Sequence, residues 1–162
     1  MIGRRKFLSL GVVALAAGAG LPAREVQAAA EVETIAINSR LIEAASNLYH
    51  RALLMVLYST GMRRAEVARL RVADLDSERM LIRIRQGKGG RDRDVPLSPA
   101  LLETLREYWR WMKPRTYLFP GTVNNWRADK PLTPKVVWIA CREAAQRAGI
   151  DERIFRRAGG AI

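Results

Sequence analysis

The chain has 162 residues, 49% of them hydrophobic, and a formal net charge of +12, which suits one domain with a hydrophobic core and argues against wholesale disorder. Cys141 is the only cysteine and His50 the only histidine, so an internal disulfide, a cysteine-based zinc site and any mechanism that needs two histidines are excluded. The excess of Arg over Lys favours a polyanionic partner such as nucleic acid over a mere solubility charge, because guanidinium groups bind phosphate in a bidentate manner.

Residues 1–30 have the layout of an export leader. A basic start with Arg4 and Arg5 precedes an apolar stretch over residues 8–21, and small residues at 28–30 offer cleavage sites. The stretch is shorter than the ~20 residues that a membrane-spanning helix needs. It resembles a twin-arginine signal, which implies the export machinery as a partner. The alternative is an Ala-rich helix of the domain, which the glycines within the stretch disfavour.

The next forty residues are predicted to be a connector followed by two helices. Residues 31–40 are expected to connect the leader to the domain. Apolar residues recur at helical spacing from Leu41 to Leu57, which predicts one long helix that ends at the break formed by residues 59–61. A shorter helix is predicted from Arg63 to Leu70.

The remainder of the chain predicts a small sheet and two further helices. "RVADLD", the alternating "MLIRIR" and "DVPL" predict a three-stranded antiparallel meander with "GKGGRDR" as an exposed loop. Ser98 and Pro99 begin a helix that ends near Met112, "YLFPG" is a short extended segment, and a last helix runs from residue 133 to Gly149. The order predicts an α+β fold that is mostly helical.

Two places carry residues suited to phosphate chemistry. Arg63 stands near a helix start, where a guanidinium can bind two phosphate oxygens, and Glu66 can hold it in place. The alternative is an ordinary surface pair, and spacing alone does not decide between them. Lys88 lies among glycines in the hairpin loop, where a flexible arm can bring an ammonium group to a leaving oxygen as general acid. A plain hairpin tip has the same composition.

The two places together resemble a known family. "LYSTGMRRAEVARLRVADLD" followed by "IRQGKGGRDRDVPLS" is similar to the catalytic domain of tyrosine recombinases, the phage integrase family, over roughly residues 41–150. That family cuts and rejoins DNA through a tyrosine–phosphate intermediate and needs no cofactor or metal. The resemblance implies the following roles: Arg63 and Lys88 are catalytic, Glu66 is a structural support, and Arg64, Arg91 and Arg93 bind DNA.

The resemblance stops before the end of the sequence. The family continues with a His-x-x-Arg box and a nucleophilic tyrosine, whereas no histidine follows His50 and the last tyrosine, Tyr117, precedes that box. We therefore expect the C-terminal part of the domain to be missing, residues 151–162 to be a divergent tail, and no nucleophile to be present. Whether the chain is an enzyme by itself stays open, and strand cleavage by it alone is not expected. The missing helices should leave Leu53, Val56, Val137 and Trp138 partly exposed.

Three functions follow as hypotheses. The first is a truncated site-specific recombinase or integrase of a mobile element, which binds double-stranded DNA in the cytoplasm. The second is an exported, periplasmic protein of unknown role that carries a decayed integrase segment. The third is a partner that docks on intact recombinase protomers. Salt-sensitive DNA binding distinguishes the first hypothesis from the second, because basic side chains release counterions from the duplex.

Overall fold

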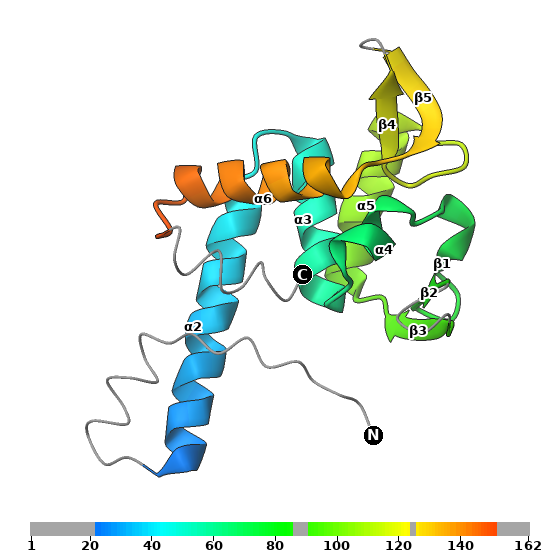
Figure 1. Ribbon diagram of the computed structural model, residues 1–162. Coiled ribbons are helices and arrows are strands. Elements are labelled where there is room, and N and C mark those ends of the chain that lie inside the picture. Colours follow the sequence, from blue (N-terminus) through cyan, green and yellow to red (C-terminus); the bar gives the residue numbers. More distant parts are fainter. Residues whose placement is uncertain (1–21, 86–90, 124–125, 152–162) are drawn as a thin grey trace.

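The computed structural model describes residues 22–85, 91–123 and 126–151, and these form helices packed beside two small sheets (Figure 1). The helices are α2 (Ala23–Glu43), α3 (Leu48–Thr60), α4 (Arg64–Ala68), the 3₁₀ turn η1 (Val72–Asp74), α5 (Pro99–Met112) and α6 (Pro134–Arg147). An antiparallel sheet in the order β1-β2-β3 contains β1 (Leu75–Asp76), β2 (Leu81–Ile84) and β3 (Arg93–Pro96), and β4 (Pro120–Val123) pairs with β5 (Trp126–Pro131). The predicted α+β, mostly helical fold with a three-stranded antiparallel sheet is confirmed.

The single long helix predicted from Leu41 is wrong, because the chain breaks between α2 and α3. The Asn47 side chain accepts a hydrogen bond from the backbone N–H of His50 at 2.8 Å, so it caps a new helix. Arg147 of α6 donates from Nε to the carbonyl of Ala44 at 2.7 Å, which satisfies a carbonyl at the end of α2. Residues 31–40, expected as a connector, lie within α2.

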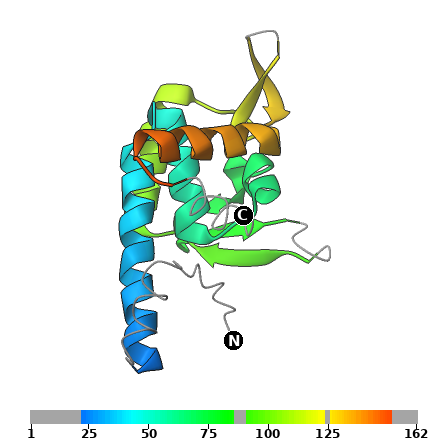
Figure 2. The same ribbon diagram turned by 60° about the vertical axis from the view of Figure 1, so that its left-hand side comes forward.

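The N-terminal half of α2 extends away from the other helices, as Figures 1 and 2 show from two directions. Val32 and Ile35 on this half have 67% and 65% of their surface exposed, whereas Leu41 near its end is 2% exposed. Only the last turns of α2 therefore contribute to the core. Among the described residues, no helix combines the length and the hydropathy that crossing a membrane requires.

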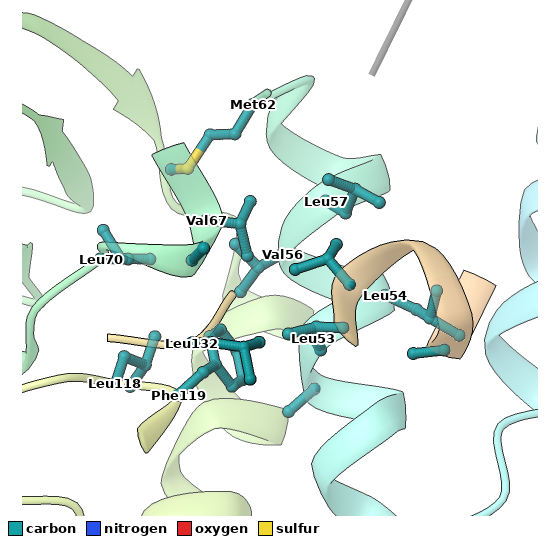
Figure 3. Packing of buried hydrophobic residues seen from close by; sticks show 14 of the residues in the cluster. Leu53, Leu54, Val56, Leu57, Met62, Val67, Leu70, Leu118, Phe119 and Leu132 are labelled. Atoms are coloured by element: carbon teal, nitrogen blue, oxygen red, sulfur yellow. The ribbon is translucent and has the colours of Figure 1, made fainter. Parts of the chain in front are cut away.

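The core lies between α3, α5 and α6 and the segment that follows α4 (Figure 3). Leu53, Val56 and Val137 are completely buried, so the expectation that they would be partly exposed is wrong. The reason is that α6 lies across α3 and covers this face (Figure 1). Trp138 is half-buried, as expected.

The sequence signals at the start of α5 and at the end of α6 are confirmed, whereas the Thr133 side chain makes no cap hydrogen bond at the start of α6. Ser98 accepts a hydrogen bond from the backbone N–H of Leu101 at 3.2 Å, with Pro99 at the first helical position. The chain leaves α6 at Gly149, whose φ of +64° is a left-handed conformation that suits glycine.

The hairpin of β4 and β5 was not predicted beyond the short extended segment at "YLFPG". Backbone bonds fix its base to the end of α4, since the N–H of Leu118 donates to Leu70 at 2.8 Å and the N–H of Leu132 donates to Ala68 at 3.1 Å. These bonds anchor the chain that leads into α6 directly beside α4. The start of α6 is thereby brought next to Arg63.

Candidate functional site

The turn between α3 and α4 places Arg63. Gly61 ends α3 with φ +62°, a left-handed conformation that favours glycine. The Thr60 hydroxyl donates to the carbonyl of Val56 at 2.5 Å and accepts from the N–H of Met62 at 3.3 Å. The Met62 side chain is 1% exposed and fixes the turn to the core (Figure 3). Arg63 consequently precedes α4 in an extended conformation with 30% of its side chain exposed.

Glu66 holds Arg63 through both backbone and side chain. Its Oε2 accepts from the backbone N–H of Arg63 at 2.8 Å, and its Oε1 accepts from Arg63 Nη1 at 3.1 Å. The Glu66 side chain is only 7% exposed. The structure thus brings together the two residues that the sequence proposed as catalytic group and support.

Arg93 is a second partner of Glu66, which sequence reasoning did not identify. Its Nη1 donates to Oε1 at 2.8 Å and its Nη2 donates to Oε2 at 2.7 Å, so the pair is bidentate. The residues are 27 positions apart in the chain. The sequence assigned Arg93 to DNA binding, and the structure places its guanidinium on this carboxylate.

The charge state of Glu66 follows from these contacts. Burial by itself raises the pKa of the carboxyl, but the hydrogen bonds from Arg93 and from the Arg63 backbone outweigh it, and the pKa is lowered below the ordinary 4.5. Glu66 is therefore ionised at neutral pH. The hydrogen bonds of Arg93 to Glu66 raise the pKa of the Arg93 guanidinium. The three side chains together carry a formal charge of +1.

A basic groove lies between α4 and the start of α6. It has a volume of about 610 Å³, and its described lining consists of Arg63, Arg64, Ala65, Pro134, Lys135 and Trp138, with no carboxylate among them. Sequence reasoning missed Lys135 and Trp138. Lys135 directly follows the Thr133-Pro134 helix start, but nothing in the sequence indicated that this start lies beside Arg63.

A second cavity, of about 450 Å³, lies between α4, η1 and the β2–β3 strands. Glu66 lines it together with Asp74, Arg69, Arg71, Arg83, Arg85 and Asp92, so it mixes both signs of charge. Asp74 has a side chain that is 4% exposed; it accepts from Arg85 Nε at 2.6 Å and from the backbone N–H of Arg71 at 3.0 Å. Ala65 lines both cavities, which places α4 between them.

Of the remaining residues proposed from the sequence, the structure describes only Arg91, which lines neither cavity. Lys88 lies outside the described residues, as do Arg4 and Arg5 of the proposed leader. Arg91 is exposed. Within the described part of the chain, no group of three or more His, Cys, Asp or Glu side chains is arranged to hold a metal ion.

Comparison with known proteins identifies the class. A sequence model of the phage integrase family matches residues 26–157, so the chain belongs to that family. The match begins within the segment that the sequence suggested as a leader. It also includes the groove and the Arg63–Glu66–Arg93 cluster.

The relatives are named as integrases or recombinases. The chain is 47% identical over 98 residues to the protein named "Putative integrase/recombinase y4qK" of Sinorhizobium fredii, an alignment that covers 60% of this chain and 30% of the relative. It is 34% identical over 113 residues to the tyrosine recombinase XerA of Pyrococcus horikoshii, which covers 69% of this chain and 39% of the relative. The chain therefore spans roughly a third of the length of these relatives.

Solved structures agree with the fold. The crystal structure of a XerA recombinase has a TM-score of 0.60 and 26% sequence identity, and the match covers 76% of this chain and 46% of the other. A lambda integrase dimer bound to a COC' core site has a TM-score of 0.55 at 18% identity, over 71% of this chain and 42% of the other, which shows the shared fold alone.

Proposed function

We propose that this chain binds double-stranded DNA through the basic groove and that its activity belongs to site-specific recombination, including integration of mobile elements. The observation that carries the proposal is the convergence of Arg63, Arg64 and Lys135 on a groove whose described lining has no carboxylate. Such a surface attracts the phosphate backbone of a duplex. The Glu66 side chain is 7% exposed, and its carboxylate is bound to the backbone and the side chain of Arg63.

The geometry supports a phosphate clamp more than an ordinary surface pair. Exposed Arg–Glu pairs contribute little, because both partners are solvated and mobile. Here the Glu66 carboxylate is buried, and the backbone of Arg63 is bound as well as its side chain. An arginine held in this way can meet the charge that develops on a scissile phosphate without reorganising. Lys88 is proposed as the general acid and Arg91 as a DNA contact, on the resemblance alone.

Other recombinase protomers are proposed as a second class of partner. Lambda integrase, which shares this fold, has been solved as a dimer on a core site and as a tetramer on a Holliday junction, and this supports the proposal. The mass of the chain on a DNA duplex, measured by analytical ultracentrifugation, tests it. One chain per duplex at every protein concentration contradicts it.

The DNA proposal is tested with the full chain and a fluorescent duplex at several salt concentrations. We expect binding that weakens steeply with salt, and Arg63→Ala should reduce the slope of log K against log salt by about 0.9, because one phosphate contact is lost. Lys135→Ala should do the same. Arg110→Ala is the matched control, since Arg110 is 68% exposed on α5 and lines neither cavity. DNA binding that does not depend on salt, or an equal loss of affinity in all three variants, contradicts the proposal that the groove binds DNA.

A second candidate function is that of an exported protein, which rests on Arg4-Arg5 and the apolar stretch behind them. Cleavage at residues 28–30 would remove the start of α2 and of the region that matches the family. For this reason we propose the cytoplasm as the location and DNA as the partner. The N-terminal sequence of the chain recovered from cells tests this, since a start near residue 31 in the periplasm establishes export.

A further inference from the structure

We infer that Arg93 is a positioning residue that holds Arg63 through Glu66, and that it does not itself bind the DNA phosphate. The inference rests on the proposed function, in which Arg63 binds the phosphate. It changes the role that the sequence suggested for Arg93.

The hydrogen bonds of Glu66 are completely shared between the two arginines. Oε1 accepts from Arg63 Nη1 at 3.1 Å and from Arg93 Nη1 at 2.8 Å. Oε2 accepts from the Arg63 backbone N–H at 2.8 Å and from Arg93 Nη2 at 2.7 Å. A carboxylate offers about four lone-pair sites, so these four bonds satisfy it. Because Glu66 is 7% exposed, losing Arg93 would leave much of a buried charge uncompensated.

The register of the sheet fixes Arg93 on the inner face. Arg93 opens β3 opposite Ile84, which is 3% exposed. Arg93 and Val95 are half-buried, whereas Asp94 between them is exposed. Side chains alternate between the faces of a strand, so the same register that buries Val95 directs Arg93 towards α4. Arg93 is not among the described residues that line the basic groove.

The hairpin is held to the α4–η1 segment at two places. Arg93 bonds to Glu66 of α4, and Arg85, which directly follows β2, bonds to the buried Asp74 of η1 at 2.6 Å. Two carboxylates of one segment thus each hold one strand of the β2–β3 pair. This arrangement ties the position of the sheet to the position of Arg63.

Lysine at position 93 could replace arginine as a phosphate contact, but it could not replace arginine as a clamp on Glu66. A direct phosphate contact needs positive charge, which lysine supplies. A bidentate clamp on Glu66 needs two donors in a rigid fork, which lysine lacks. Arg93→Lys therefore separates positioning from phosphate binding without removing charge.

The first test needs no DNA. The Nε–H signal of Arg63 is recorded by nitrogen-15 NMR in the full chain, assigned with Arg63→Lys, and compared in Arg93→Ala and Arg93→Lys. We expect both variants to shift the Arg63 signal and to speed its exchange with solvent. Arg79→Ala is the matched control, because the Arg79 side chain is exposed, pairs with Asp76 at 3.9 Å and lines neither cavity. An Arg63 signal that is unchanged in both Arg93 variants overturns the inference.

The second test is a double-mutant cycle on DNA affinity. We expect Arg93→Ala and Glu66→Gln each to weaken binding about fivefold, and the double variant to be no weaker than Glu66→Gln alone, because both act through one network. Arg93→Lys should bind as poorly as Arg93→Ala. The inference is overturned if the losses of DNA affinity add in the double variant and Arg93→Lys restores binding, since Arg93 would then contact the phosphate directly. If the wild-type chain does not bind DNA, the proposed function fails, and the NMR result still decides the role of Arg93. Thermal unfolding of each variant controls for loss of fold.

Discussion

At the scale of single residues, the site depends on one buried carboxylate. Glu66 receives four hydrogen bonds from Arg63 and Arg93, which lower its pKa despite its burial. Because the pKa of Glu66 is lower in the folded chain, the carboxyl of the unfolded chain takes up its proton at a higher pH than that of the folded chain. The stabilisation from Glu66 is therefore complete above about pH 4.5 and is lost as the pH falls through the lower pKa of the folded state.

The corresponding prediction concerns Glu66→Gln. At neutral pH we expect the variant to lose about 1–3 kcal/mol of unfolding free energy, because charge-assisted bonds are removed and the two arginines are half exposed. The loss should shrink as the pH falls below 4.5, where the wild-type carboxyl itself becomes protonated. Urea unfolding of the wild type and the variant, at pH values from about 3 to about 7, measures how this loss of unfolding free energy depends on pH. Glu103→Gln, in a surface pair at 3.8 Å, should change stability little at any pH. If Glu66→Gln loses the same unfolding free energy at every pH, the ionised carboxylate of Glu66 is not the source of the stabilisation.

At the scale of elements, local signals predicted some boundaries and long-range contacts decided the others. The caps of α5 were readable because Ser98 and Pro99 act on their own helix. The break before α3 was missed because the apolar spacing continues across it, although Asn47 is a capping residue. Strand β5 escaped prediction since "WRADKP" has no apolar alternation. The Glu66–Arg93 bond joins residues 27 positions apart, and no local pattern in one sequence indicates such a pair.

The turn after α3 gives an element-scale prediction. We expect Gly61→Ala to cost about 1–2 kcal/mol of unfolding free energy, because an L side chain is strained at its φ of +62° although no atom lies within 4 Å of the added carbon. Gly61→Asn should cost less, since asparagine tolerates this conformation better. Thermal unfolding measured by circular dichroism compares the two. Equal losses would mean that the backbone conformation is not the cause.

At the scale of the whole molecule, the site is assembled by elements that are far apart in sequence. Arg63 follows α3, Lys135 comes from α6, and Arg93 comes from the sheet. The β4–β5 segment brings α6 to α4 through its backbone bonds to Leu70 and Ala68. Each of these elements also packs on the common core, so the cationic groove depends on the fold of the described domain as a unit.

The N-terminal half of α2, unlike these elements, does not pack on the common core. Of its residues from Ala23 to Ala36, those whose side chains are described are exposed or half-buried, and burial begins at Leu41. We expect removal of residues 1–30 to change the unfolding free energy by less than about 0.5 kcal/mol, because those of them whose side chains the structure describes are exposed or half-buried. Leu41→Ala should cost about 2–4 kcal/mol, because it leaves a cavity in the core. Urea unfolding of the full chain, the shortened chain and Leu41→Ala provides the measurement. A shortened chain that unfolds would show that residues 1–30 belong to the domain, and export by cleavage there would then destroy the DNA groove.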